Sequence, residues 1–314
     1  MENRTRGVRI ALERGLFLFS ALLLLLAGTQ AIAAQPAGGA PGPEVCKNCH
    51  QEKYDTFIAH RHGMKADART PAAKGGCVTC HGDGTAHVKA GGGRGVGGIK
   101  NPGSKAMASE EKNGLCLTCH EGGKRMHWSQ SLHASRDTTC TSCHKVHATN
   151  DPVREKTTQA EVCFTCHKEQ RAQINRPYRH PIPEGKVVCS DCHNPHGSAG
   201  PKYMVRDSVN ETCYQCHMEK RGPFVRSHQP VTEDCSICHN PHGSTNPFMV
   251  KVRIPFLCQS CHDQASHHDG EATLGAGGRS AVFQARGCEN CHTQIHGSNA
   301  PSAAGTGTGR AFRR

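Results

Sequence analysis

The chain has 314 residues, of which 35% are hydrophobic and only 4% aromatic, and its formal net charge is +12. Chains of this length ordinarily bury one or two apolar cores, and this composition excludes a core built from side chains alone. Either another group supplies the buried apolar mass or the chain is disordered.

The first 33 residues have the features of a secretion signal. Arginines precede an apolar run at 16–27, and Ala31 and Ala33 follow in an A-x-A arrangement. The run is about 12 residues long, whereas a spanning helix needs about 20, which favours a cleaved signal over a retained membrane anchor. We therefore expect an exported, periplasmic protein. The basic charge would suit nucleic acid, but export and the lack of a recognition motif exclude that partner.

Every cysteine belongs to a C-x-x-C-H pentad. Ten pentads use all 20 cysteines, and C-x-x-C-H is the attachment signal of a c-type haem. Two thiols three positions apart form thioethers to one haem, and the next His becomes the proximal iron ligand. The cysteines are Cys46, Cys49, Cys77, Cys80, Cys116, Cys119, Cys140, Cys143, Cys163, Cys166, Cys189, Cys192, Cys213, Cys216, Cys235, Cys238, Cys258, Cys261, Cys288 and Cys291. The proximal histidines are His50, His81, His120, His144, His167, His193, His217, His239, His262 and His292.

Three other interpretations of these cysteines fail on the same point. Half of a zinc site, a thioredoxin-like redox pair and a disulfide framework can each contain C-x-x-C. None of them requires a His after the second cysteine in all ten cases. The sequence therefore predicts ten haems c, with no disulfide and no free thiol.

The pentads group into five dihaem units. CSDCHNPHGS at 189–198 returns as CSICHNPHGS at 235–244, which indicates an internal repeat. A decahaem domain at 34–296 would contain the five units and a glycine-rich loop at 91–98. A flexible tail at 297–314 would follow this domain. The predicted fold is an elongated multihaem cytochrome with short α-helices, irregular chain and little or no β structure. The five units span about 44–90, 113–150, 160–198, 210–244 and 255–296.

Histidines outside the pentads also repeat, and each unit contributes two of them as candidate distal ligands. A His follows each odd-numbered pentad by 5–13 positions and each even-numbered pentad by 3–6. The set after the even-numbered pentads is unambiguous. The set after the odd-numbered pentads contains three doublets: His60/His62, His127/His133 and His267/His268. Spacing favours His62 and His133, and His267 is a weaker choice over His268. The predicted distal ligands are His62, His87, His133, His147, His180, His196, His228, His242, His267 and His296.

The shortest spacings predict which iron each His reaches. His193 and His196 are three residues apart, so the chain between them reaches about 10 Å. That is too short to pass round a porphyrin to the opposite face of the same iron. His196 should therefore ligate a neighbouring haem, and the same argument holds for His147 and His242. Met64 and Met126 are alternative axial ligands that the surplus of histidines makes unnecessary.

The sequence resembles the periplasmic decahaem cytochromes of the MtrA, DmsE, MtoA and PioA type. The resemblance covers nearly the whole mature chain and all ten pentads, and it aligns the family's ligand in the second doublet with His133. It leaves His267 and His268 both open. The matching segments are GKRMHWSQSLHASRDTTCTSCHKVH (123–147), VCSDCHNPHGS (188–198), NETCYQCHMEKRGP (210–223), EDCSICHNPHGS (233–244) and GCENCHTQIHGSN (287–299).

The resemblance implies a conduit that inserts into an outer-membrane β-barrel porin. Its partners would be periplasmic or inner-membrane cytochromes on one side and an extracellular cytochrome, reductase or mineral on the other. Electron flow could run outward to metal oxides or dimethyl sulfoxide, or inward from ferrous iron. The alternatives are a soluble periplasmic shuttle and a multihaem oxidoreductase. Histidines suffice to fill every iron, which favours an electron carrier over an enzyme.

Overall fold

The computed structural model describes residues 40–262, 288–290 and 292–299. The chain divides into two compact parts, Met1–Pro41 and Gly42–Arg314, and the second contains all ten pentads. The predicted signal peptide lies outside the described residues, as do His267, His268 and Cys291.

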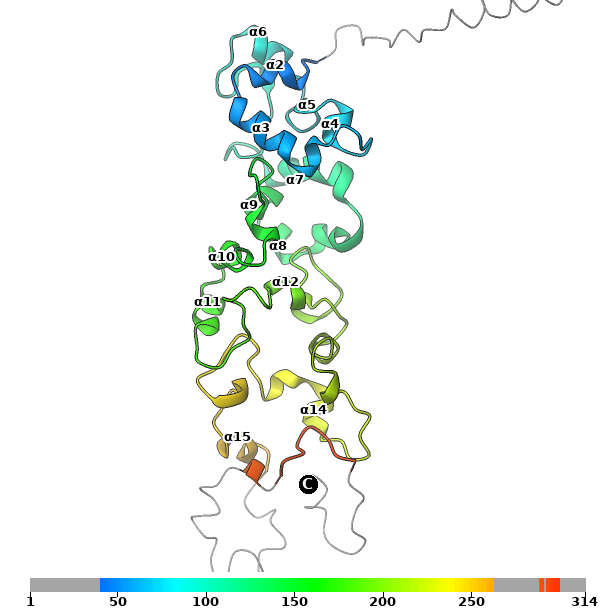
Figure 1. The fold of residues 1–314 in the computed structure, drawn as a ribbon, viewed down its shortest axis with the longest axis vertical. Helices are drawn as coiled ribbons and strands as arrows, with labels where there is room; N and C mark the ends of the chain where they lie inside the picture. Colours follow the sequence, from blue (N-terminus) through cyan, green and yellow to red (C-terminus); the bar gives the residue numbers. More distant parts are fainter. Residues whose placement is uncertain (1–39, 263–287, 291, 300–314) are drawn as a thin grey trace, which may run out of the picture. The chain divides into compact units, whose positions relative to one another are not determined.

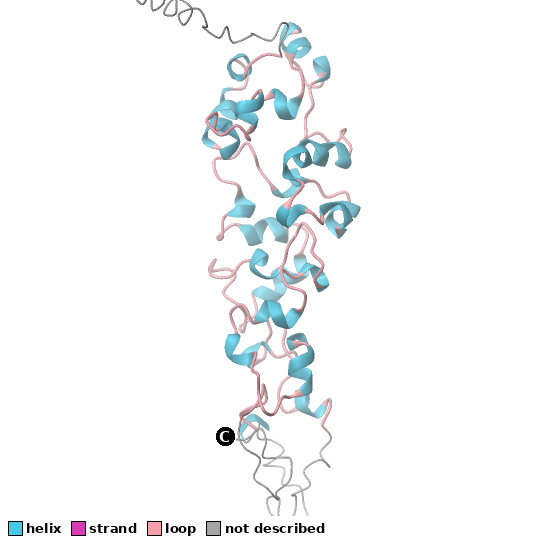
Figure 2. Ribbon diagram, turned by 90° about the vertical axis from the view of Figure 1, so that its right-hand side faces the viewer, coloured by secondary structure: helices cyan, strands magenta, loops and turns pink. Residues whose placement is uncertain are grey.

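Within the second part, short helices alternate with irregular chain (Figures 1 and 2). The longest helix in the described ranges has 12 residues. The α-helices are α2 Pro43–Lys47, α3 Gln51–Ala59, α4 Pro71–Lys74, α5 Val78–His81, α6 Thr85–Lys89, α7 Ser109–His120, α8 Leu132–Ser135, α9 Cys140–Cys143, α10 Gln159–Phe164, α11 Lys168–Ile174, α12 Cys189–Cys192, α13 Val209–Cys213, α14 Gln229–Glu233 and α15 Phe256–Gln259. The 3₁₀-helices are η1 Arg61–Gly63, η2 Val96–Gly98, η3 Gly123–Arg125, η4 Trp128–Gln130, η5 Pro152–Arg154, η6 Pro201–Tyr203, η7 Met218–Lys220, η8 Cys235–Ile237, η9 Pro247–Met249 and η11 Cys288–Asn290.

Extended pairing is confined, in the described residues, to isolated bridges. The multihaem fold with short helices, irregular chain and little or no β structure is thus confirmed. Prolines and glycines explain the short helices. Helix α4 begins at Pro71 beneath a Thr70 cap and ends at Gly75, whose φ of 137° suits glycine.

The side-chain core is small, as the composition predicted. One cluster of buried apolar residues joins Ala160, Phe164, Ile174 and Ile182. Among the described residues, the largest side chain with less than 2% exposure is that of Ser131. Side chains alone therefore do not provide the close-packed interior that a chain of this size normally has.

Backbone bridges join consecutive dihaem units. Tyr178 of the third unit and Ser244 of the fourth exchange N–H···O bonds of 3.2 and 2.8 Å. Arg226 of the fourth unit pairs in the same way with Ser298, at 2.9 Å for both bonds. The residues 297–299 at the start of the predicted tail belong to this second bridge, and residues 300–314 lie outside the described residues.

Bilayer-spanning helices were also sought in the described ranges. None of the helices there combines the necessary length with the necessary apolarity.

Candidate functional site

A single helical turn shapes each pentad. The His144 N–H donates to the carbonyl of Cys140 at 2.8 Å, and His193 does the same to Cys189 at 2.9 Å. Seven further pentads repeat this bond at 2.9–3.1 Å. Positions i, i+3 and i+4 share one face of such a turn. In the nine pentads that are described throughout, the two sulfurs and the imidazole therefore point to the same side.

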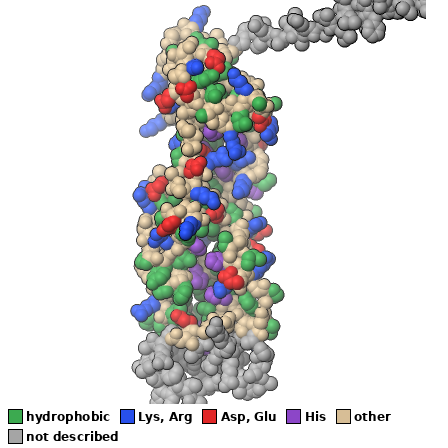
Figure 3. All heavy atoms as spheres, viewed as in Figure 1, with side chains coloured by type: hydrophobic (Ala, Val, Ile, Leu, Met, Phe, Trp, Pro, Cys, Tyr) green, Lys and Arg blue, Asp and Glu red, His purple; other side chains and the backbone are tan. Residues whose placement is uncertain are grey.

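Among the described residues, nine pentad histidines face a second His ring from elsewhere in the chain. Figure 3 shows histidine side chains gathered in a band through the middle of the face in view, beside hydrophobic side chains. The ring-centre distances are 6.4 Å for His50–His87, 6.2 Å for His81–His147, 5.8 Å for His62–His120, 6.1 Å for His144–His196, 6.1 Å for His133–His167, 6.1 Å for His193–His242, 6.2 Å for His180–His217, 6.2 Å for His239–His296 and 6.0 Å for His228–His262.

The spacing of these rings fits one iron between two imidazoles. Two metal–nitrogen bonds of about 2.0 Å, plus about 1.1 Å from each nitrogen to its ring centre, give about 6.2 Å. Rings in direct contact occur over a wider range of about 4.5–7 Å, whereas the nine distances all lie between 5.8 and 6.4 Å. The histidines therefore match a bis-histidine haem at nine positions.

Each short-spaced His faces the proximal His of a different pentad. His196 lies opposite His144, with ring planes 7° apart, while its sequence neighbour His193 faces His242. His147 likewise faces His81 rather than the adjacent His144. These positions are the ones that the reach argument requires.

The direction of the pairing alternates along the chain. An odd-numbered pentad after the first takes its second His from the preceding unit, as His167 takes His133. An even-numbered pentad takes its second His from the following unit, as His144 takes His196. Two such pairs, running in opposite directions, join each described unit to the next. The pair His50–His87 is different because both residues belong to the first unit.

In the first two doublets, the structure distinguishes the His that faces a pentad His from the other member. In the first, His62 faces His120, whereas the Nδ1 of His60 accepts the N–H of His62. In the second, His133 faces His167. The third doublet lies outside the described residues.

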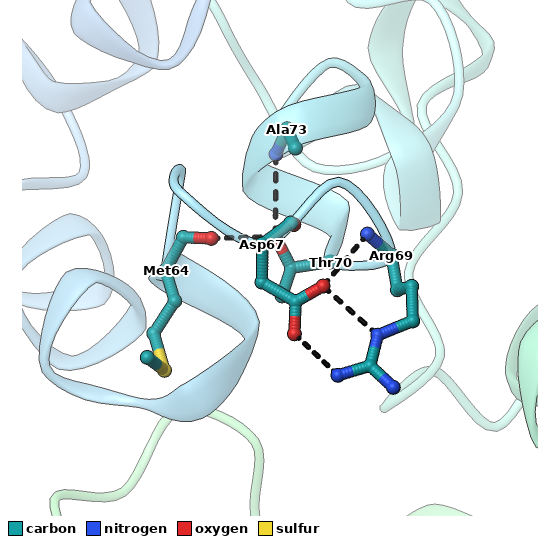
Figure 4. A network of polar contacts seen from close by, with 5 residues as sticks. All are labelled: Met64, Asp67, Arg69, Thr70 and Ala73. Carbon is teal, nitrogen blue, oxygen red and sulfur yellow. Dashed lines mark hydrogen bonds and ion pairs between the residues drawn. The ribbon is translucent and has the colours of Figure 1, made fainter.

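The two methionines considered as alternative ligands are largely exposed: Met64 by 55% and Met126 by 65%. Figure 4 shows the turn that follows Met64. The Thr70 hydroxyl donates to the Met64 carbonyl at 2.8 Å, and Asp67 binds the Arg69 guanidinium at 2.8 and 3.0 Å. The turn leads the chain from η1, which contains His62, to α4 and the second pentad.

Burial favours the neutral form of two of the facing imidazoles. It is the largest cause that lowers the pKa of His62 and of His196 to about 4. A metal ligand must be the neutral ring, so both side chains are in the required form at neutral pH.

Backbone carbonyls orient many of these rings through Nδ1. The Nδ1 atoms of His133 and His180 lie 2.7 and 2.8 Å from the carbonyl oxygens of Pro195 and Pro241. When Nδ1 donates to a carbonyl, the lone pair of Nε2 is directed to the facing ring. Each of these two carbonyls belongs to an N-P-H-G-S segment of the following unit, so orientation as well as pairing depends on the neighbour.

A strained turn supplies the carbonyl for two proximal histidines. Lys202 and Tyr203 have φ values of 51° and 58°, in the left-handed region that L-residues avoid. The turn brings the Lys202 oxygen 3.0 Å from His193 Nδ1, and the Tyr203 oxygen accepts the N–H of Asn194 at 2.7 Å. The copy at 248–249 repeats both angles and both bonds. Such strain is typical of functional positions.

Buried amides join the two pentads within each interior unit. The Asn113 side-chain oxygen accepts the N–H of Cys140 at 2.8 Å, and that of Asn210 accepts the N–H of Cys235 at 2.7 Å. Gln159 does the same for the 189–193 pentad at 3.0 Å. These amides are only 6–8% exposed. They set the separation between the two attachment points of a unit.

The cysteine sulfurs, which stand here for thioether sulfurs, approach one another in alternation. Within a unit the first cysteines are neighbours: burial and Cys46 raise the pKa of Cys77 to about 11, and a hydrogen bond with Cys163 lowers that of Cys189 to about 7. The second cysteines of successive units also influence each other. The neighbouring sulfurs within units are Cys46–Cys77, Cys116–Cys140, Cys163–Cys189, Cys213–Cys235 and Cys258–Cys288, and those between units are Cys80–Cys119, Cys143–Cys166, Cys192–Cys216 and Cys238–Cys261.

Comparison with known proteins agrees with this geometry. Residues 180–222 and 228–267 match the family model for a doubled CXXCH motif, and residues 77–159 match that for a cytochrome c-type protein that is NrfB-like. The chain is 43% identical over 268 residues to the multiheme cytochrome MtrA of Shewanella baltica (strain OS185), which covers 83% of this chain and 80% of the relative. The molecule is thus a multihaem c-type cytochrome. Within that class, the chain belongs to the MtrA family.

Sequence reasoning found the ring-bearing residues but not the groups that hold them. Asn113, Gln159 and Asn210 lie three or four positions before an odd-numbered pentad, and that regular position was the available signal. Asp151 was also missed: its carboxylate lies 2.7 Å from His144 Nδ1. Nothing in its sequence position separates it from a surface aspartate.

Proposed function

We propose that this chain conducts electrons through ten covalently attached haems c, as the cytochrome subunit of an outer-membrane porin–cytochrome complex. The observation that carries the proposal is the set of nine His–His pairs, each at the spacing that one iron would bridge. All 20 cysteines would form thioethers. The tenth centre would take His292 and, on spacing, His267, with His268 as the alternative.

The chemistry of such a centre is limited. A bis-histidine haem supplies one-electron exchange between ferric and ferrous iron, with both axial positions taken. The chain's histidines thus leave no position for a substrate at nine centres, which supports an electron carrier over an oxidoreductase. Where Nδ1 bonds a backbone carbonyl, as in His133 and His180, that bond would hold the ring in one orientation.

The order of the contacts supports conduction along the chain. First cysteines lie together within a unit and second cysteines lie together between units, so each attachment point has the next one beside it. Two His–His pairs also connect each described unit to the next one, in opposite directions along the chain. Residues that fix consecutive attachment points close together favour transfer from one end to the other.

The porin partner and the periplasmic location rest on the resemblance to the MtrA, DmsE, MtoA and PioA type and on the predicted signal. The partners proposed on either side are a periplasmic or inner-membrane cytochrome and an extracellular cytochrome, reductase or mineral. A soluble shuttle differs from this proposal only in lacking a stable membrane partner.

The decisive test is affinity purification of the tagged holoprotein from mildly solubilised outer membranes, with identification of co-eluting proteins by mass spectrometry. A stoichiometric β-barrel partner is expected, and liposomes with an enclosed redox dye would then report conduction and its direction. Recovery of the cytochrome alone in the periplasmic fraction would replace the conduit by the shuttle. Intact mass and ferric EPR test the ten haems and their low-spin state independently of any partner.

A further inference from the structure

The pair His144–His196 differs from its counterparts in what its two Nδ1 atoms meet. His144 Nδ1 lies 2.7 Å from Oδ2 of Asp151, whereas His196 Nδ1 is buried with no hydrogen-bond partner. The histidines that correspond to His144 in the next two units, His193 and His239, bond backbone carbonyls at 3.0 and 2.9 Å. One centre of the series thus has a carboxylate where the equivalent centres have a neutral oxygen.

Asp151 is held for this contact. Its side chain is only 8% exposed, and its other oxygen, Oδ1, accepts the backbone N–H of Lys145 at 3.1 Å. Its own carbonyl accepts the N–H of Arg154 at 2.9 Å, which fixes the turn into η5. Both carboxylate oxygens therefore have assigned donors, and one of the two donors is a ligand ring.

On the opposite side of the pair, a buried aromatic ring covers His196. Trp128, the only tryptophan of the chain, is 7% exposed and packs edge-on against His196 with ring centres 6.1 Å apart. Charges act more strongly in such buried surroundings than in water. A fixed carboxylate beside one ligand is therefore not masked by solvent.

We propose that Asp151 is a positioning residue that lowers the reduction potential of the fourth centre, acting through His144. This inference rests on the proposed bis-histidine ligation. Two effects have the same sign. The carboxylate withdraws the Nδ1 proton of His144 and makes the ring a stronger donor to iron, and its negative charge favours the ferric over the ferrous state.

For conduction, the consequence is a lower reduction potential at the fourth of the ten centres. An electron that passes from the third centre to the fifth occupies the fourth less readily than it would with a carbonyl at His144. Because of Asp151, the fourth centre would therefore be in the ferrous state for a smaller fraction of the time.

The test compares Asp151→Asn with Glu219→Gln in the purified holoprotein by EPR-monitored redox titration. Glu219 is the matched control because its carboxylate lies 3.7 Å from His217 Nδ1 but is 59% exposed. In Asp151→Asn the midpoint potential of one low-spin signal should rise by about 59 mV, which is a change of about tenfold in the one-electron ferric–ferrous equilibrium constant. Glu219→Gln should move no signal by a comparable amount, and Asp151→Glu should restore the wild-type value.

Superimposable titrations of Asp151→Asn and wild type would overturn the inference, as would equal shifts at all centres. Where Asp151→Asn does not assemble, the isosteric pair Asp151→Glu and Asp151→Gln replaces it, and coincident potentials in that pair refute the role of the charge. Spin integration separates this failure from that of the proposed function. A wild-type protein without ten low-spin irons refutes the ligation itself, and ten such irons without a shift refute only the role of Asp151.

Discussion

The first dihaem unit and the interior units complete their histidine pairs in different ways. In the second, third and fourth units, every pentad His faces a ring from an adjacent unit, whereas His50 of the first unit faces His87 of the same unit. The pentads are also joined differently. Interior units use buried amides such as Asn210, and the first unit has Pro43 packed 3.1 Å from where a Cβ on Gly76 would lie. One centre of the first unit is thus complete within that unit, although His81 still faces His147 of the second unit, whereas both centres of an interior unit depend on neighbours.

Loss of an interior distal ligand should have the largest effect. His196→Ala breaks one of the two pairs that join the second and third units, so one iron in ten becomes high-spin in the ferric EPR spectrum. We expect the free energy of unfolding to fall by about 4 kcal/mol or more, because the loss of a metal site is among the most destabilising effects of a single substitution. His87→Ala should give the same spin change with a smaller fall in melting temperature, since it breaks no pair between units. His127→Ala, a change in the second unit at a ring outside the nine pairs, should produce no high-spin iron. Equal melting temperatures for the first two variants would contradict the comparison.

The amide that joins two pentads should come next. Asn210→Leu leaves the Cys235 N–H and the carbonyls of Val231 and Thr232 without their partner, and an unpaired buried group costs about 1–3 kcal/mol. Chemical unfolding of the holoprotein should register this loss. Asn210→Asp keeps the acceptor but not the donor and should fall between wild type and Asn210→Leu. Pro43→Ala, at the corresponding place in the first unit, should cost less than either.

Two neighbouring glycines test how the first unit closes. Gly97 and Gly98 have φ values of 74° and 72°, so alanine is strained at either by about 1–2 kcal/mol. At Gly97 a Cβ would also overlap the backbone of His87, whereas at Gly98 it meets nothing within 4 Å. Gly97→Ala should therefore destabilise more than Gly98→Ala and add high-spin iron at the first centre alone. High-spin iron at an interior centre would show that the first centre is not confined to its own unit.

The smallest effect should be a pH dependence confined to the turn after Met64. Hydrogen bonds from Arg69 hold the pKa of Asp67 at about 2, below its ordinary 3.8. Because the folded pKa is depressed, the pair stabilises the protein above pH 3.8, and this contribution disappears as the pH falls through about 2. Melting curves of wild type and Asp67→Asn should converge over that window. Since the pair is exposed, the difference at neutral pH should be small. A gap that widened toward acid would contradict this sign.

The sequence was sufficient for the fold class and for the expectation that a short-spaced His serves a neighbouring centre, for a physical reason. The spacing within C-x-x-C-H and the three-residue separation of His193 and His196 are covalent constraints, and covalent reach limits the options to a neighbouring centre. Orientation was not predictable because it depends on carbonyls from distant chain, as Pro195 serves His133. Asp151 was hidden for the same reason: its importance comes from burial beside His144. The assignment of His267 and the boundary of the signal remain predictions.

On the proposed export and haem attachment, the alternating direction of the histidine pairs would also order the maturation of the protein. A secreted chain leaves the cytoplasm N-terminus first, so the third, fifth, seventh and ninth centres would find their second histidine in segments already exported. The second, fourth, sixth and eighth must wait, as His144 waits for His196 in the following unit. During export the growing protein would therefore alternate between closed irons and irons with one open axial position. A truncated product would expose such an iron at its newest even-numbered centre, where peroxide or a foreign ligand could reach it first.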